Sequence, residues 1–392
     1  MAELNYDFFS PPQVVFGWGR RNELGRLAGG LGRRAWIVAG SRTLERSGTL
    51  TELCGLLSEA GLIAEVVANI SREPLVEDVD LLVQGLRERR SGSGDMMIAV
   101  GGGSAIDLAK AAGALVTNPF SDTVKDFLEG VGKGLKIVHP PLPLLAMPTT
   151  GGTGTEATKN AVISSFDPPF KKSLRSEWMV PRCVLIDPEL SCSVPPNVTA
   201  WTGLDAITQC LESYITRKPR PIPQALGLQG LKLAVPALPQ AVRDGQSVEA
   251  RCAMAHAAFL SGMALANSGL GVAHGIAASL GVHAHVAHGL ACAVLLPTAI
   301  QVNRVVRERE LAFLGMELTG RSWATPAAAI DALADLIGGL LSELSIPRRL
   351  SQLGVKPEQL DDLAAGSQGN SLNGNPRELS VADVRRILEE LL

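Results

Sequence analysis

This sequence has little excess charge of either sign and few aromatic side chains. Only 4% of its 392 residues are aromatic, and the net charge is −3 because basic and acidic residues nearly balance. Without a basic excess, nothing in the composition favours binding to nucleic acid or to an acidic membrane surface. Hydrophobic residues still make up 46% of the chain, so it can bury a large core in one or two domains.

Paired cysteines and long apolar runs are missing as well. The six cysteines are dispersed, and the closest two, Cys183 and Cys192, are nine residues apart. This spacing argues against a disulfide framework or a thiolate zinc site and suits a reducing compartment. The apolar runs are too short to span a bilayer, and Met1–Pro12 lacks the basic start and apolar core of a secretory signal. We therefore predict a soluble cytoplasmic protein with no membrane partner.

The first half of the chain alternates short apolar, β-branched runs with amphipathic segments. Such alternation predicts a doubly wound parallel sheet with helices on both faces. Helical patterns cover Thr49–Ala60 and Val76–Arg89. The expected strands are Ala35–Ala39, Ala64–Val67, Met96–Val100, Pro143–Met147 and Cys183–Ile186.

After Asp187 the strand-like runs almost vanish and long Ala- and Leu-rich segments follow. We predict an α/β domain over residues 1–190 and an all-helical domain over residues 191–392. Small-molecule sites favour the cleft between two such domains. The expected helices are Gly203–Ile215, Gln224–Ala241, Val248–Leu265, Ala273–Leu280, Pro326–Leu344 and Val381–Leu391.

A run of three glycines follows one expected strand and opens a helical pattern. Gly101, Gly102 and Gly103 are followed by Ser104. Glycines let backbone N–H groups approach a pyrophosphate, and the helix N-terminus adds partial positive charge. The segment is neither a P-loop nor a G-x-G-x-x-G fingerprint. It favours phosphate binding over a simple turn.

A second polar loop, Pro148–Thr158, follows another expected strand. Its five threonines and three glycines would suit a sugar or a nicotinamide at the carboxyl ends of the strands. On its own, a threonine-rich loop is usually only a solvated loop. Two such loops at strand ends strengthen each other.

Four of the six histidines lie within fifteen residues, between His274 and His288. Imidazole is a common metal ligand and proton carrier, although buried histidines of a helical core would give the same pattern. Asp205 and Gln209 are four residues apart, so they share a face of a helix. Taken alone, Asp205 is typical of an acidic residue at a helix N-terminus, and Gln209 is typical of a polar surface residue. Together with His274 and His288 they could bind Fe(II) or Zn(II).

These segments, taken in order, resemble the iron-containing (group III) alcohol dehydrogenase family. The resemblance extends from Phe16–Gly19 to Asn375–Arg377, which is nearly the whole chain. The motifs that carry it are Gly101–Ser104 with Asp107, the Pro148–Glu156 loop, Asp187–Leu190, Gly203–Ala206, His274–Gly275, His288–Gly289 and Leu296–Pro297.

The resemblance implies a dehydroquinate synthase-like two-domain fold. It also implies an enzyme that interconverts a small alcohol and its aldehyde or ketone. The helical half would hold a divalent metal through Asp205, position 209, His274 and His288, and the metal would act as a Lewis acid for hydride transfer. Family members often dimerise through N-terminal strands, so we expect a homodimer through Gln13–Phe16. The implied NAD(P) contacts are Gly40, Ser41, Gly101, Gly102, Gly103, Ser104, Asp107, Thr149, Thr150, Thr153, Thr158, Asn160, Lys171 and Leu190.

The sequence departs from the family pattern at three positions. Gln209 replaces a histidine, so the metal should bind weakly or not at all. Ala278 replaces a histidine near the substrate. His283 and His285 could partly take over its role, although histidines in such positions are more often ordinary loop or surface residues. Gly40 replaces an acid that would repel a 2′-phosphate, and the Ser41–Arg42 pair could bind that phosphate. We therefore expect a preference for NADP(H) over NAD(H).

Three other functions remain open. Gln209 is also compatible with a metal-independent reductase that resembles maleylacetate reductase. A sugar-phosphate cyclase like dehydroquinate synthase is disfavoured, because Gly203–Leu211 and Val272–Gly289 contain no lysine or arginine for a substrate phosphate. The chain could also be a non-catalytic relative that keeps the fold and the nucleotide.

Overall fold

The computed structural model describes residues 5–392, so the start of the expected domain 1–190 and of the Met1–Pro12 segment lies outside the described residues. The chain divides into two compact units. The sheet unit comprises residues 9–150 and 154–194, and the helical unit comprises residues 195–392 together with residues 5–8 and 151–153. The main division thus falls at Val194/Pro195 rather than at residue 190, and two short segments before it also belong to the helical unit.

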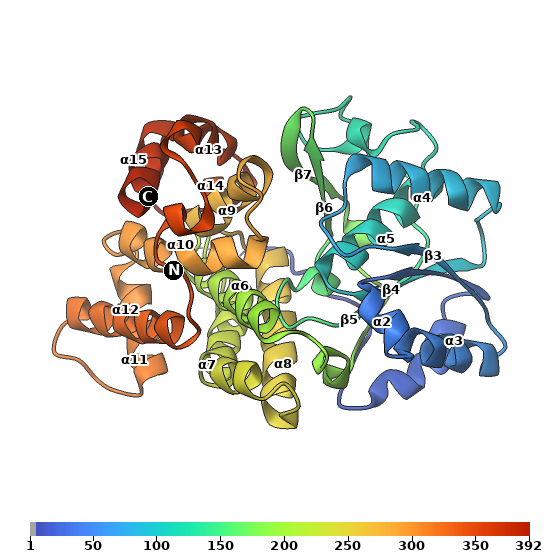
Figure 1. Ribbon diagram of the computed structural model, residues 1–392, viewed down its shortest axis with the longest axis horizontal. Helices are drawn as coiled ribbons and strands as arrows, with labels where there is room; N and C mark the ends of the chain where they lie inside the picture. Colours follow the sequence, from blue (N-terminus) through green and yellow to red (C-terminus); the bar gives the residue numbers. More distant parts are fainter. Residues whose placement is uncertain (1–4) are drawn as a thin grey trace. The chain divides into compact units, whose positions relative to one another are not determined.

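The sheet unit contains a parallel sheet of six strands in the order β1-β8-β5-β4-β2-β3 (Figure 1). Alternate residues of β2 point to opposite faces, so Trp36 and Val38 join one core and Ile37 the other. The predicted doubly wound sheet is therefore correct. The strands are β1 (Val14–Phe16), β2 (Arg34–Ala39), β3 (Ile63–Asn69), β4 (Asp95–Gly101), β5 (Leu144–Pro148) and β8 (Cys183–Ile186).

Helices cover both faces of this sheet. One core lies beneath α4 and α5, and the other beneath α1, α2 and α3. The helices are α1 (Leu24–Gly29), α2 (Arg42–Arg46), α3 (Thr49–Glu59), α4 (Val76–Glu88) and α5 (Gly103–Val116). Five 3-10 helices lie between these elements: η1 (Arg20–Glu23), η2 (Val124–Phe127), η3 (Thr155–Ala157), η4 (Glu177–Met179) and η5 (Pro188–Ser191).

Two strands of the sheet unit were not expected from the sequence. β6 (Asn160–Phe166) and β7 (Pro169–Arg175) form an antiparallel pair. The sequence pattern did not indicate this pair, because β7 has a proline and two lysines among its seven residues. β1 is only three residues long, and it pairs in parallel with β8 at the edge of the sheet. The homodimer through Gln13–Phe16 stays a prediction.

The helical unit is built around a single hydrophobic core. Its first helix begins at Pro196, so Asp205 lies inside the helix and not at its N-terminus. The helices are α6 (Pro196–Ile215), α7 (Pro221–Arg243), α8 (Val248–Ala266), α9 (Val272–His283), α10 (His288–Asn303), α11 (Glu308–Thr319), α12 (Pro326–Glu343), α13 (Leu360–Gly366), α14 (Asn370–Asn373) and α15 (Val381–Leu391), with 3-10 helices η6 (Leu350–Leu353) and η7 (Pro357–Gln359).

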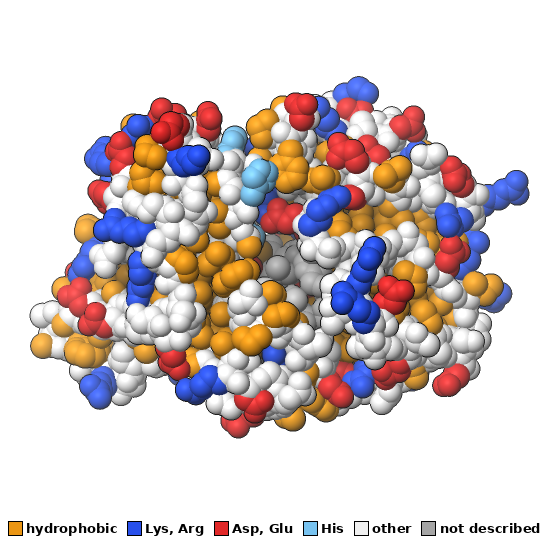
Figure 2. Space-filling model, viewed as in Figure 1, with side chains coloured by type: hydrophobic (Ala, Val, Ile, Leu, Met, Phe, Trp, Pro, Cys, Tyr) orange, Lys and Arg blue, Asp and Glu red, His pale blue; other side chains and the backbone are white. Residues whose placement is uncertain are grey.

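The sequence pattern did not indicate α10, α11, α13 or α14. α10 is apolar on all sides and contains Pro297, so it shows neither a polar face nor an unbroken helical run. Among residues 5–392, no helix is both long enough and apolar enough to cross a bilayer. On the face drawn in Figure 2, acidic and basic side chains are interspersed over each unit.

A glycine brings α10 close to α6. A Cβ on Gly289 would lie 2.6 Å from the carbonyl oxygen of Trp201, and a backbone atom cannot move aside as a flexible side chain can. α10 begins at His288, so this close approach also determines where the His288 imidazole lies relative to α6.

We expect the change Gly289→Ala to lower the free energy of unfolding by about 1–3 kcal/mol, the usual cost of overpacking. Gly339 is the matched control, because it lies inside α12 and a Cβ there would meet nothing within 4 Å. Gly339→Ala should raise stability by up to about 1 kcal/mol through helix propensity. Denaturant unfolding of both variants measures the difference, and equal stabilities would contradict the close packing.

Candidate functional site

Four potential metal donors converge inside the helical unit. Asp205 on α6, His274 on α9, and His288 and Cys292 on α10 each offer one donor atom, and these atoms all lie within 4.8 Å of one another. Asp205 Oδ1 lies 3.1 Å from His274 Nε2 and 3.9 Å from His288 Nε2. Cys292 Sγ lies 3.7 Å from His288 Nε2. We call these four residues the donor group.

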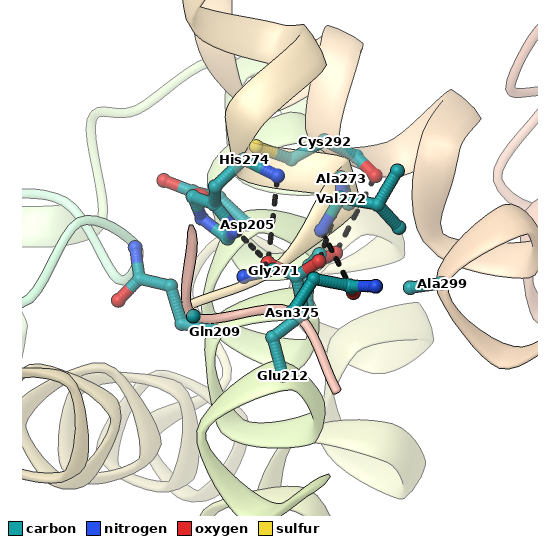
Figure 3. Close-up of polar contacts among 12 residues, drawn as sticks. Asp205, Gln209, Glu212, Gly271, Val272, Ala273, His274, Cys292, Ala299 and Asn375 are labelled. Atoms are coloured by element: carbon teal, nitrogen blue, oxygen red, sulfur yellow. Dashed lines mark hydrogen bonds and ion pairs between the residues drawn. The ribbon is translucent and has the colours of Figure 1, made fainter. Parts of the chain in front are cut away.

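A second carboxylate, Glu212, orients His274 from the opposite side of the ring. It accepts a hydrogen bond of 2.7 Å from His274 Nδ1 and bonds of 3.0 and 2.7 Å from the backbone N–H groups of Gly271 and Ala273 (Figure 3). These N–H groups belong to the first turn of α9, whose amides have no partner within the helix. Glu212 therefore turns Nε2 of His274 toward Asp205.

Asn375 completes the support of the α9 N-terminus. Its side-chain oxygen accepts hydrogen bonds from the backbone N–H of Val272 (3.2 Å) and from Nδ2 of Asn303 (2.9 Å). Its own Nδ2 donates to Asn303 Oδ1 at 3.1 Å. All of these groups are buried, so each hydrogen bond replaces one lost to water.

The electrostatics of the donor group favour a positive charge beside Asp205. Burial opposes ionisation of Asp205, yet the hydrogen bond from His274 and the charge of His288 lower the pKa of Asp205 to about 2. Burial likewise opposes protonation of His274, but Cys292, Asp205 and Glu212 together raise its pKa well above the usual value. Burial raises the pKa of the Cys292 thiol to about 12. A proton on His274 therefore balances the buried carboxylate, and a bound cation could take that role.

Gln209 lies beside the donor group and is not one of its members. Its Oε1 accepts a hydrogen bond of 3.0 Å from Ser261 Oγ, and the Gln209 side chain also helps to lower the pKa of the Asp205 carboxyl. In Figure 3 the amide oxygen of Gln209 points away from Asp205, His274 and Cys292. Of the four predicted ligands, the structure thus brings Asp205, His274 and His288 together and turns the oxygen of Gln209 elsewhere.

The sequence analysis missed Cys292 and Glu212. Both carried a detectable signal: Cys292 is four residues after His288, and Glu212 is seven after Asp205, spacings that share a helix face. His283 and His285, the suggested substitutes for a histidine at Ala278, lie at and just beyond the end of α9. Neither belongs to the donor group.

In the sheet unit, the predicted glycine and threonine loops meet where the strand order reverses. From β2 the chain continues outward to β3, whereas from β4 it continues to the opposite side through β5. Ligands of doubly wound sheets bind at such switch points. A Cβ on Gly101 would lie 2.7 Å from Gly40 Cα, and the Thr149 N–H donates to the Gly101 carbonyl at 3.0 Å. A Cβ on Gly102 would lie 3.3 Å from Thr150 Oγ1.

Other predicted cofactor contacts surround this switch point or lie apart from it. Gly103 and the half-buried Ser104 form the first turn of α5. Ser41 accepts a hydrogen bond from the Thr43 N–H at the start of α2. Leu190 is buried in the core beneath α1 and α3, and Thr153 belongs to the helical unit.

A buried lysine, Lys110, anchors the chain between η3 and β6. Its Nζ donates to the carbonyls of Thr155, Thr158 and Asn160 at 2.6–3.0 Å and to Thr158 Oγ1. Burial lowers the pKa of Lys110 and raises that of its neighbour Asp107. Thr158 and Asn160 are thereby held in place by α5. The remaining predicted contact, Lys171, pairs with Glu73 at 2.6 Å.

Both halves of the sequence match models of one protein family. Residues 11–188 match the model "Iron-containing alcohol dehydrogenase", and residues 199–392 match "Fe-containing alcohol dehydrogenase family, C-terminal".

Individual relatives agree over nearly their whole length. The NAD-dependent methanol dehydrogenase of Bacillus methanolicus is 30% identical over 98% of this chain and 100% of its own. The probable alcohol dehydrogenase EutG of Salmonella typhimurium is 34% identical over 96% and 92%. The crystal structure of sulfoacetaldehyde reductase from Bifidobacterium kashiwanohense in complex with NAD+ is 27% identical, with a TM-score of 0.87 over 99% of both chains. The chain therefore belongs to the iron-containing alcohol dehydrogenase family and is an oxidoreductase that acts on alcohols.

Proposed function

We propose that this protein transfers hydride between a small alcohol and NAD(P), and that Fe(II) or Zn(II) held by Asp205, His274 and His288 assists the reaction. The convergence of these three side chains from three helices carries the proposal. In the oxidising direction the alcohol loses a hydride to NAD(P)+ and a proton to solvent, which gives the aldehyde or ketone. In the reverse direction NAD(P)H supplies the hydride.

The residues present fit a divalent cation. One anionic carboxylate and two imidazoles are common donors to iron and zinc, and Glu212 supplies the outer hydrogen bond that such histidines usually make. When bound, the cation supplies a Lewis acid that favours the alkoxide form of an alcohol.

The exposure of the donors indicates the side from which an alcohol arrives. The His288 side chain is 26% exposed, whereas those of Asp205 and His274 are 2% and 4% exposed. The substrate would therefore reach the site past His288. Asp205 contributes fixed negative charge, and Glu212 keeps the Nδ1 proton of His274 away from the reacting side.

The nucleotide would bind at the switch point of the sheet unit. Gly101 and Gly102 leave room for a pyrophosphate, and the N-terminus of α5 offers backbone N–H groups to it. The NAD+ complex of the sulfoacetaldehyde reductase relative supports a nicotinamide nucleotide as the hydride carrier. The proposed location of the protein is the cytoplasm, because dispersed cysteines suit a reducing compartment.

The first test is cofactor reduction with a panel of short alcohols, after removal of metal by a chelator and after restoration with Fe(II) or Zn(II). We expect turnover only in the restored enzyme. Asp205→Asn should lower kcat/KM by more than the roughly 10–100-fold that outer-shell changes cost. Asp331→Asn, which removes only a surface ion pair with Arg304, should leave it unchanged.

Two outcomes would favour the alternatives. Equal turnover of the metal-free enzyme would indicate a metal-independent reductase of the maleylacetate-reductase type. Tight nucleotide binding without turnover on any alcohol or aldehyde would indicate a non-catalytic relative.

We further infer a preference for NADP(H), from the end of β2. Gly40 places no carboxylate there, and its close contact with Gly101 disfavours any larger side chain. Arg42 is exposed at the first position of α2, where its guanidinium and the helix N-terminus could both receive a 2′-phosphate.

We expect Arg42→Ala to lower the ratio of kcat/KM for NADPH to that for NADH by about tenfold, since a hydrogen bond to a charged group contributes about 1.5–3 kcal/mol. Arg46→Ala, at the opposite end of the same short helix, is the control and should leave the ratio unchanged. A wild-type enzyme that uses NADH more efficiently than NADPH would contradict the inference.

A further inference from the structure

The fourth member of the donor group, Cys292, has no role in the proposed function so far. Its side chain is fully buried, and it lies one helical turn after His288. Cys210 is equally buried in the same core, but its sulfur packs against Gly230 of α7, where an added Cβ would lie 2.5 Å from it. Of the cysteines, only Cys292 shares the donor group with Asp205, His274 and His288.

In the family pattern the residue at position 209 is a metal ligand. Here the Gln209 side chain already has a hydrogen-bond partner. The oxygen of Gln209 accepts a hydrogen bond of 3.0 Å from Ser261 Oγ, and in Figure 3 it points away from Asp205, His274 and Cys292. Turning this oxygen toward a cation would break its hydrogen bond with Ser261.

Three of the separations within the donor group lie near those of a tetrahedral site. Bond lengths of about 2.0–2.3 Å place neighbouring donors about 3.3–3.6 Å apart. The distances from Asp205 Oδ1 to His274 Nε2 and to His288 Nε2 are 3.1 and 3.9 Å, and Cys292 Sγ lies 3.7 Å from His288 Nε2. Shifts of a few tenths of an ångström would bring all three pairs into the tetrahedral range.

Donor chemistry points to the same residue, because a cysteine thiolate is a common and strong ligand of zinc, whereas an amide oxygen is a weak one. The thiol proton leaves to solvent when the metal binds, because only the thiolate is a ligand.

We propose that Cys292 is the fourth protein donor to the metal, in an Asp-His-His-Cys site in which Gln209 is not a ligand. This inference rests on the proposed function for the presence of a divalent metal. A thiolate donor makes the site softer than one built from oxygen and imidazole alone and shifts its preference toward zinc. The spacing of the cysteines from one another could not indicate this role, because Cys292 gains its partners through helix packing and not through a second nearby cysteine.

Metal alone, without alcohol or nucleotide, is the probe for the test. The wild-type protein loaded with Co(II) should show a near-ultraviolet thiolate-to-cobalt charge-transfer band. Cys292→Ala should lose that band and bind Co(II) at least about tenfold more weakly. Cys210→Ala removes a thiol from the same core and, like Gln209→Ala, should retain the band. Far-ultraviolet circular dichroism checks that each variant is folded.

A second measurement needs no variant. X-ray absorption of the zinc-loaded wild-type protein should reveal one sulfur at about 2.3 Å beside nitrogen and oxygen donors. A shell of nitrogen and oxygen only, or a charge-transfer band that survives in Cys292→Ala, would overturn the assignment while leaving the proposed function intact. A sulfur donor in a protein that turns over no alcohol would support the assignment and contradict the function.

Discussion

The site depends on a carboxylate that is ionised while almost completely buried. Asp205 is 1% exposed, and an isolated charge in that position would cost many kcal/mol. His274 resolves this problem by placing its Nε2 3.1 Å from Asp205 while Glu212 accepts from Nδ1 on the other side. The His274 imidazole thus lies between two carboxylates. Its proton supplies the positive charge that a bound metal cation would otherwise supply.

The same contacts that orient His274 also hold the fold together. Asp205, Gln209 and Glu212 share one face of α6, and Glu212 accepts N–H groups from the first turn of α9. The N-cap residue Gly271 has no side chain to offer, so Glu212 and Asn375 together satisfy the amides at the start of α9. Because α6 is a long buried helix rather than a loop, the position of Asp205 varies little, as precise placement of reacting groups requires.

The sequence predicted the parts of this protein whose signals are local. The strands around Ile37 and Ile98 and the helices of the second half were evident from periodicity and turn residues. The hairpin of β6 and β7 was not, because Lys171 and Lys172 interrupt its apolar pattern. Motif resemblance brought Asp205, His274 and His288 together, but Cys292 was dismissed because cysteines were judged by their spacing from one another. Its partners lie on other helices, and no spacing along the chain encodes how α6, α9 and α10 pack.

A departure from a family pattern is best judged at the level of the whole site. At position 209 alone, glutamine in place of histidine suggests a weakened or empty site. In the structure, that glutamine has its own hydrogen-bond partner, Ser261, while the buried sulfur of Cys292 lies within 4.8 Å of the donor atoms of Asp205, His274 and His288. A chain that had simply lost its metal would have no reason to retain a buried carboxylate, a second carboxylate to orient the opposing histidine, and two imidazoles, since each buried charge costs stability unless it is paired. The charged groups around the altered position 209 are all retained. This favours a metal site with a changed set of donors over a site that has lost its metal.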